Sequence, residues 1–263
     1  MNILITGANG YIGNYLSNYL FEKKEFNLYL FNRKRVKNFE YKPNTFFLDL
    51  NKKNIDWNQY LRKIDIVIHL AATQHKLEKQ KNLNAYFKTN SSSVRELLSY
   101  CVKNNIKKFI YLSSIKVNGE KTFKNKSFSY LDKPNPKTIY AESKYSGEQE
   151  IKKFFNNKKT EIYIIRIPLV YGFKPKGYLS TFTKFVSKGY PLPLKCFNNN
   201  LRSYISIYNL NDFIYNIIKN KNNNTGLYLL SDSDDHSTYD FLKQFSKIIS
   251  NKSKFIYIPK III

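Results

Sequence analysis

The chain is poor in the residues that build disulfide frameworks, metal sites and membrane spans. Of its 263 residues only Cys101 and Cys196 are cysteines. They form no CxxC pair, so we expect no disulfide framework, no zinc site and no bound metal, and both thiols are predicted to be reduced and buried. No run approaches the roughly 20 apolar residues of a bilayer span, and the first strand follows no basic, apolar leader. We therefore expect a cytoplasmic protein with no membrane span.

Proline and acidic residues are also scarce. With 8 prolines and a hydrophobic fraction of 42%, the chain is predicted to fold rather than to remain disordered. The 44 Lys and Arg against 19 Asp and Glu give a net charge of +25, a feature of many nucleic-acid-binding proteins. However, the lysines are spread along the chain beside abundant Asn, Ile, Tyr and Phe, whose codons are all rich in A and T. Genome composition therefore explains the charge, and we expect no nucleic-acid partner.

Apolar segments that suit β-strands alternate with segments of helical periodicity. The strand candidates are residues 3–6, 27–32, 45–48, 64–70, 108–113 and 161–167. This alternation predicts a parallel sheet covered by helices on both faces, because right-handed crossovers place the helices there. The expected fold class is α/β, a Rossmann-like doubly wound parallel sheet.

The first 13 residues, MNILITGANGYIG, place three glycines between a short apolar strand and an amphipathic helix. Gly7, Gly10 and Gly13 lack a Cβ, so backbone amides in this turn can approach a ligand closely. The free amides of a helix N-terminus attract an anion, and after a strand the expected anion is the pyrophosphate of a dinucleotide. Tight turns also collect glycines, but the position between strand and helix favours a dinucleotide.

A second candidate site combines a tyrosine, a lysine and a serine. Tyr140 and Lys144 are four residues apart in TIYAESK, so they share one face of a helix. A nearby ammonium is expected to lower the pKa of Tyr140 toward neutrality, which would let the phenol serve as acid and base. Ser113 and Ser114 end a strand at the edge where open α/β sheets bind ligands, and a hydroxyl there could bind a substrate oxygen. The alternatives are a surface Tyr-Lys pair and serines that only end the strand.

The pattern changes after Tyr171. Prolines and glycines crowd residues 172–193, followed by a strand at 204–208, a helix at 210–219, a strand at 226–231 and a helix at about 238–250. We interpret residues 1–171 as a dinucleotide-binding domain and residues 172–263 as a small C-terminal substrate lobe that is partly interleaved with it. The terminal FIYIPKIII ends in an apolar run without a polar stop, so a truncated C-terminus is expected.

Seven motifs, in this order and spacing, resemble the extended short-chain dehydrogenase/reductases of the NAD-dependent epimerase/dehydratase family. They are TGANGYIG at the N-terminus, Leu48-Asp49-Leu50, HLAA (69–72), Asn90, SSIKVNG (113–119), YAESK (140–144) and RIPLVYG (166–172). Together they cover nearly the whole chain. Within this family the chain looks most like nucleotide-sugar epimerases, dehydratases and 4-keto reductases, because residues 189–210 and 227–242 are similar to the segment that holds the sugar nucleotide.

The resemblance implies roles for individual residues. Tyr140 would be the acid and base, Ser114 would polarise the substrate oxygen, and Lys144 would bind the nicotinamide ribose and tune Tyr140. Cofactor contacts are implied for Gly7, Gly10, Tyr11, Ile12, Gly13, Asn32, Arg33, Asp49, Leu50, Leu70, Ala71, Ala72, Asn90, Tyr140, Lys144 and Ile167. Substrate contacts are implied for His75, Ser114 and Arg202, with the planar guanidinium of Arg202 clamping a diphosphate.

Two departures from the family pattern affect the cofactor and the sugar. NAD-using members carry an acidic residue at the end of the second strand, whereas this chain has Asn32 and Arg33 followed by Lys34 and Arg35. An arginine there suits a 2′-phosphate, so NADP(H) is favoured, with NAD(H) as the alternative. Where many epimerases have an asparagine three residues after the arginine of RIPLVYG, this chain has Leu169, which puts one sugar contact in doubt.

These features predict an enzyme that moves a hydride between C4 of a nucleotide-linked sugar and a nicotinamide. The basic strand end favours NADPH-dependent reduction of a 4-keto sugar. The first alternative is an NAD-dependent 4-epimerase, and the second is a non-catalytic dinucleotide sensor, a class that typically loses the tyrosine and lysine. The resemblance implies a UDP-linked substrate from polysaccharide biosynthesis, and a homodimer formed through the helices near Cys101 and Tyr140.

The remaining conspicuous side chains are expected to be structural. His69 lies in an apolar strand and is interpreted as a core histidine. His236, beside two aspartates, is expected in an exposed loop without metal-ligand spacing. Trp57, the single tryptophan, is expected to pack on the sheet.

Overall fold

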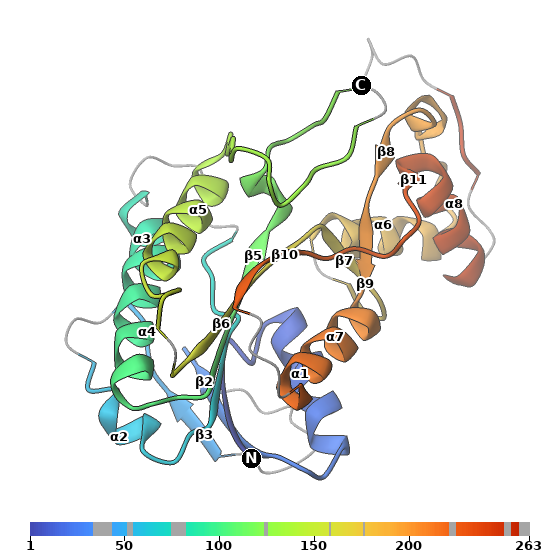
Figure 1. Ribbon diagram of the computed structural model, residues 1–263. Helices are drawn as coiled ribbons and strands as arrows, with labels where there is room; N and C mark the ends of the chain where they lie inside the picture. The colour runs from blue at the N-terminus through green and yellow to red at the C-terminus, as the bar shows by residue number, and fades with distance from the viewer. Residues whose placement is uncertain are drawn as a thin grey trace. The chain divides into compact units, whose positions relative to one another are not determined.

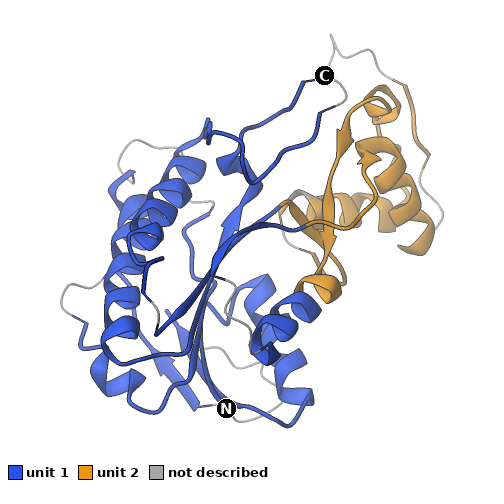
Figure 2. Cartoon of the chain, in the orientation of Figure 1, with its two compact units in different colours: residues 1–167, 211–230 blue, residues 168–210, 231–263 orange. Residues whose placement is uncertain are grey.

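The computed structural model describes residues 1–33, 44–51, 55–74, 83–123, 126–157, 159–175, 177–220, 225–249 and 254–257. The chain divides into two compact units (Figure 2). The first contains residues 1–167 and 211–230, and the second contains residues 168–210 and 231–263. The domain boundary expected after Tyr171 remains a prediction.

A seven-stranded parallel sheet forms the centre of the first unit (Figure 1). Its strands, in spatial order, are β10 (Gly226–Leu229), β6 (Glu161–Ile167), β5 (Lys108–Ser114), β4 (Ile66–His69), β1 (Asn2–Thr6), β2 (Asn27–Asn32) and β3 (Asn44–Phe47). Every neighbouring pair runs parallel. The six strands expected in the first part of the chain are present, and the predicted Rossmann-like α/β fold is confirmed.

Helices cover both faces of this sheet (Figure 1). One face carries α3 (Leu83–Phe87), a π-helical turn (Lys88–Ser92), α4 (Ser93–Lys103) and α5 (Ile139–Lys152), and the other carries α1 (Tyr11–Glu22) with α7 (Ile207–Lys219). A short helix, α2 (Asn58–Leu61), and a 3-10 turn (Ile115–Val117) complete the unit. Among the described residues no helix is long and apolar enough to cross a membrane.

The middle strands are buried from end to end. All residues of β4 and β5 are buried, as their β-branched and apolar composition predicts for a parallel sheet covered on both faces. Trp57 is fully buried and packs against Phe31, with ring centroids 5.8 Å apart, as the sequence suggested. This rigid centre holds the carboxyl ends of the strands in fixed positions, where the candidate site lies.

One element lies in a different unit from the one expected. The strand expected at 226–231 was assigned to the C-terminal lobe, but β10 is the edge strand of the main sheet beside β6. Tyr228 stacks on Tyr163 with ring centroids 5.9 Å apart, and Leu227 packs on the core of the first unit. Burial of these apolar side chains on the sheet explains the correction.

Among its described residues, the second unit has two small two-stranded sheets and three helical segments besides the start of α7. β7 (Leu169–Tyr171) pairs in parallel with β9 (Tyr204–Ser206), and β8 (Leu201–Arg202) pairs antiparallel with β11 (His236–Ser237). The helical segments are α6 (Tyr178–Ser187), a 3-10 turn (Lys195–Phe197) and α8 (Thr238–Ile249). The sequence signal for α6 was missed, because prolines and glycines surround it.

Candidate functional site

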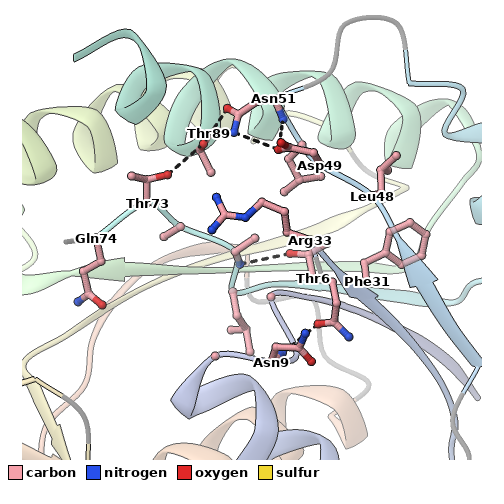
Figure 3. Close-up of a pocket in the computed structure, with 17 residues that line it drawn as sticks. Thr6, Asn9, Phe31, Arg33, Leu48, Asp49, Asn51, Thr73, Gln74 and Thr89 are labelled. Atoms are coloured by element: carbon pink, nitrogen blue, oxygen red, sulfur yellow. Dashed lines mark hydrogen bonds between the residues drawn. The ribbon is translucent and has the colours of Figure 1, made fainter. Parts of the chain in front are cut away.

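A cavity of about 520 Å³ lies where β1, β2 and β4 end (Figure 3). Its lining combines the glycine turn, the end of β2 and the loops that follow β3 and β4. The lining residues are Thr6, Gly7, Asn9, Gly10, Phe31, Asn32, Arg33, Leu48, Asp49, Leu50, Asn51, Leu70, Ala71, Ala72, Thr73, Gln74 and Thr89. Open α/β sheets bind their ligands at this edge.

The glycines of the opening motif serve two different purposes. Gly7 has φ +72°, and a Cβ there would lie 2.7 Å from the Ala71 nitrogen, so only glycine fits between the turn and the loop after β4. A Cβ on Gly13 would lie 2.3 Å from the Gly7 carbonyl oxygen. Gly13 therefore allows α1 to pack on the turn rather than lining the cavity. Gly10 precedes α1 and lines the cavity, so the helix N-terminus opens onto it.

The end of β2 brings an amide and a guanidinium to the cavity. Asn32 is buried, and its Oδ1 accepts a hydrogen bond of 2.9 Å from the Asn9 backbone nitrogen, which fixes the glycine turn against β2. Arg33 is exposed and extends into the cavity (Figure 3). Its positive charge at this strand end is the feature on which the NADP(H) prediction rests.

A ladder of polar side chains lines the opposite wall of the cavity (Figure 3). Asp49 Oδ1 accepts from the backbone nitrogen of Asn51 at 3.0 Å and from its Nδ2 at 3.1 Å. Thr89 donates to Asn51 Oδ1 at 2.9 Å, and Thr73 donates to Thr89 at 3.1 Å. Sequence reasoning found Asp49 but missed Asn51, Thr73 and Thr89, because no local pattern brings these separate segments together.

Asn90 supports the cavity wall from behind. It is fully buried in the π-helical turn, its Oδ1 accepts from the Thr73 backbone nitrogen at 2.9 Å, and its Nδ2 donates to the Thr73 carbonyl at 3.1 Å. The same Nδ2 donates to Ser143 on α5 at 2.9 Å. Asn90 does not line the cavity; it connects the cavity wall to α5. π-Helical turns are frequent at functional sites.

The structure places the predicted serine near the tyrosine, and the lysine one helical turn from the tyrosine. Ser114 ends β5, Tyr140 lies in the first turn of α5, and the Ser114 side chain lies near enough to Tyr140 to lower its pKa. Thr138 caps α5 by accepting from the Ala141 nitrogen at 3.2 Å, which fixes the start of the helix. Lys144 is buried one turn further on, with its Nζ 4.0 Å from the centroid of the Tyr111 ring.

The expected direction of the Tyr140 pKa shift is wrong. Burial raises the pKa of Tyr140 to about 12, and the nearby Ser114 side chain only partly offsets this effect. Burial also lowers the pKa of Lys144 to about 7, against the opposing charge of Glu148. The spacing of the pair suggested a fully charged ammonium beside the phenol. Desolvation of the lysine weakens that charge, so burial controls both groups.

The two serines of the motif have separate partners. Ser113 donates to Glu148 Oε1 at 2.5 Å, whereas Ser114 interacts with Tyr140 and accepts from the Lys116 nitrogen at 3.3 Å. Glu148 was missed in the sequence, although it stands four residues after Lys144. This spacing places both side chains on one face of α5.

The other predicted residues are distributed as follows. Tyr11, Ile12 and Ile167 are described but do not line the cavity, and His75 lies outside the described residues. Arg202 is exposed on β8 in the second unit. Its partner on the neighbouring strand β11 is His236, which therefore lies in a strand rather than in the expected loop. His69 is buried in β4, where its Nδ1 lies 3.0 Å from Thr6 Oγ1 and burial lowers its pKa to about 3, so it is a neutral core residue.

Comparison with known proteins identifies the class. The sequence profile of the NAD dependent epimerase/dehydratase family matches residues 3–228. The chain belongs to this family, whose members include enzymes that act on nucleotide sugars with a nicotinamide dinucleotide.

Three proteins illustrate the similarity. UDP-glucose 4-epimerase of Vibrio cholerae is 29% identical over 249 residues, which cover 93% of this chain and 75% of the relative. The crystal structure of UDP-glucuronic acid 4-epimerase from Bacillus cereus with NAD has a TM-score of 0.82 at 22% identity, covering 98% of this chain and 86% of the other. The dTDP-4-dehydrorhamnose reductase of Bacillus anthracis with NADP has a TM-score of 0.79 at 23% identity, covering 98% and 84%. At these identities the two structures show the shared fold.

Proposed function

We propose that the protein transfers a hydride at C4 of a nucleotide-linked sugar, using a nicotinamide dinucleotide. The observation that supports this most directly is that Ser114 lies near Tyr140, with Lys144 one helical turn away. In a proton-coupled hydride transfer, a phenol can move the proton, a hydroxyl can bind the oxygen and an ammonium can favour the phenolate. A non-catalytic sensor has no use for these three groups together.

The residues of the cavity fit a dinucleotide. The Gly7 turn, the start of α1 at Gly10 and the polar ladder from Asp49 would hold its phosphates and adenine. When bound, the nicotinamide supplies a site that accepts and returns a hydride. The proposed contacts of Tyr11, Ile12, Gly13, Leu50 and Ile167 with the dinucleotide rest on the family resemblance. So do those of the loop after β4, Leu70, Ala71 and Ala72.

Proton transfer would be carried out by the chain itself. As the phenolate, Tyr140 would take the proton from the C4 hydroxyl as that carbon is oxidised, and as the phenol it would give the proton back when the carbon is reduced. Ser114 would donate a hydrogen bond to the same oxygen, where charge develops. Lys144 would bind the ribose and favour the phenolate. Contacts of His75 and Arg202 with the sugar diphosphate are part of this proposal.

Between the two outcomes of this chemistry, the relatives favour 4-epimerisation. UDP-glucose 4-epimerase of Vibrio cholerae is similar to this chain over 249 residues, so a UDP-sugar is the proposed substrate. NADPH-dependent reduction of a 4-keto sugar is the second candidate. It is favoured by Arg33 in the cavity and by the lack of a carboxylate in the sequence at the end of β2.

The experiment incubates the purified protein with UDP-glucose, with UDP-N-acetylglucosamine or with a 4-keto sugar nucleotide, and follows sugar product and nicotinamide absorbance together. Product without net change in the nicotinamide indicates an epimerase, and stoichiometric loss of NADPH indicates a reductase. Tyr140→Phe is expected to lower turnover by about 10²–10⁴-fold while dinucleotide binding persists. Tyr145→Phe on the same helix is the control. Unchanged turnover in Tyr140→Phe would reject the catalytic assignment and favour the sensor.

Cofactor choice is tested separately by binding. Arg33→Ala is expected to weaken NADPH binding about tenfold and to leave NADH binding nearly unchanged, because the arginine contacts only the additional 2′-phosphate. Arg62→Ala, an exposed arginine outside the cavity, is the control. Equal losses for the two dinucleotides would contradict the NADP(H) preference.

A further inference from the structure

A fully buried ion pair lies behind the proposed catalytic residues. Glu148 on α5 and Arg166 on β6 both have side chains that are 0% exposed. The guanidinium binds the carboxylate through both oxygens, Nε to Oε1 at 2.9 Å and Nη2 to Oε2 at 2.5 Å. Ser113 donates to Oε1, and Arg166 Nη1 donates to Asn118 Oδ1 at 2.8 Å. Buried charges persist when such hydrogen bonds satisfy them.

This arrangement prevents a pairing that the helix would otherwise favour. Lys144 and Glu148 are four residues apart, the spacing at which opposite charges on a helix form ion pairs. No ion pair of Lys144 is found within the described residues, because Arg166 and Ser113 occupy the carboxylate. The ammonium of Lys144 instead lies over the Tyr111 ring.

We propose that Glu148 and Arg166 are positioning residues for Lys144. Arg166 and Ser113 hold the Glu148 carboxylate away from the ammonium. The opposite charges of Glu148 and Arg166 together set the electrostatic field at Lys144 and Tyr140. This inference rests on the proposed function, because it assigns Lys144 a role in dinucleotide binding and proton transfer. It adds Glu148, Arg166 and Ser113 to the residues on which that role depends.

Charged and titratable groups near Lys144 lie on α5 and on three strands of the sheet. They are Tyr140 and Glu148 on α5, Tyr111 on β5, His69 on β4 and Arg166 on β6. The pKa of His69 is lowered to about 3, and the pKa values of both tyrosines are raised, so these three groups are neutral near pH 7. Of these groups, only the ion pair of Glu148 and Arg166 therefore carries permanent charges.

The test uses two single substitutions with opposite electrostatic effects. Glu148→Gln leaves the Arg166 charge unbalanced, which lowers the pKa of both Lys144 and Tyr140. Arg166→Gln leaves the Glu148 charge unbalanced, which raises both. The limbs of the pH profile of turnover, and of dinucleotide affinity, should move by about one pH unit to lower pH in the first variant and to higher pH in the second. The double variant should lie near wild type.

The control is Glu161→Gln, at the amino-terminal end of the same strand as Arg166. Its carboxylate lies 3.5 Å from Lys108 and is far along β6 from the site, so no limb should move. If both single variants lose activity equally at every pH without moving a limb, the pair is merely structural and the proposal is overturned.

Two further measurements keep the test decisive. The pKa of Lys144 is about 7 in the folded chain and higher in the unfolded chain. Between these two pH values the unfolded chain binds one more proton than the folded chain, so the free energy of unfolding should rise with pH. Urea unfolding across this range is compared between each variant and the same variant carrying Lys144→Met. The pH at which the Lys144 contribution to stability begins should move to lower pH in Glu148→Gln and to higher pH in Arg166→Gln. This readout needs no activity, so it separates failure of the proposal from failure of the proposed function.

The second measurement covers the case in which the single variants do not fold. Arg166→Lys keeps the positive charge but loses the bidentate contact with Glu148. Glu148 should then form an ion pair with Lys144, and the dissociation constant for the dinucleotide should rise about three- to tenfold. A variant identical to wild type in that constant and in its pH profile would overturn the proposal.

Discussion

At the scale of single residues, the site depends on a close approach between α5 and the π-helical turn. Gly147 allows it: a Cβ there would lie 2.2 Å from the Asn90 carbonyl oxygen and 2.7 Å from the Tyr111 hydroxyl. The Tyr111 hydroxyl donates to that same carbonyl at 3.1 Å. Because Gly147 has no side chain, the helix that carries Tyr140 and Lys144 can pack closely against the π-helical turn that supports the cavity wall.

Replacing Gly147 with alanine should therefore destabilise the protein, although alanine is the better helix former. The backbone carbonyl of Asn90 cannot move aside without disturbing the turn, so we expect a loss of about 2–3 kcal/mol in urea unfolding, together with weaker dinucleotide binding. Gln149→Ala, two residues further along the same helix and exposed, should change stability by less than about 0.5 kcal/mol. Gly147→Ala with wild-type stability would show that the contact is not as tight as described.

How much of the site the sequence can predict depends on the kind of information involved. The four-residue spacing of Tyr140 and Lys144 and the position of Ser114 after an apolar strand are local, and the structure does place Ser114 near Tyr140, with Lys144 one helical turn away. The raised pKa of Tyr140 follows from burial, which spacing alone does not report. The contact between Glu148 and Arg166 joins segments distant in sequence, and no local pattern reveals it.

At the scale of elements, the strands of the main sheet were predictable and their complete order was not. Continuous apolar runs between helices identify β1, β2, β4, β5 and β6. β10 has the same apolar character, but its place beside β6 depends on a long excursion of the chain through the second unit. Lys108 links another element distant in sequence, α7, to the sheet. From the start of β5 its Nζ donates to the Ile217 carbonyl at 2.7 Å and to the Asn220 carbonyl, at the end of α7.

Lys108→Met should lower stability by about 1–3 kcal/mol. The substitution removes the donor from two carbonyls at the C-terminal end of α7 and a positive charge that the helix dipole favours there. Lys107→Met is a matched control one residue away, because its ion pair with Asp65 is largely exposed and is worth at most about 1 kcal/mol. Midpoints of urea unfolding for the two variants give the comparison, and equal losses would contradict a capping role for Lys108.

At the scale of the whole molecule, the largest departure from an ordinary enzyme is the net charge of +25. The candidate site does not need this charge, since its key charged groups are the balanced pair of Glu148 and Arg166, together with Lys144 and Arg33. With 44 Lys and Arg against 19 Asp and Glu, the excess positive charges repel one another. Such self-repulsion destabilises a compact state and is reduced by salt.

The melting temperature should accordingly rise when sodium chloride increases from about 10 mM to about 150 mM, over which range the screening length falls from roughly 30 Å to roughly 8 Å. The gain should level off above that concentration, because most of the repulsion is then screened. Sodium sulfate at the same ionic strength separates the causes: screening predicts a similar rise, and a much larger rise indicates anion binding or salting out. A melting temperature that stays constant or falls over this range would show that the positive charges are neutralised by local contacts.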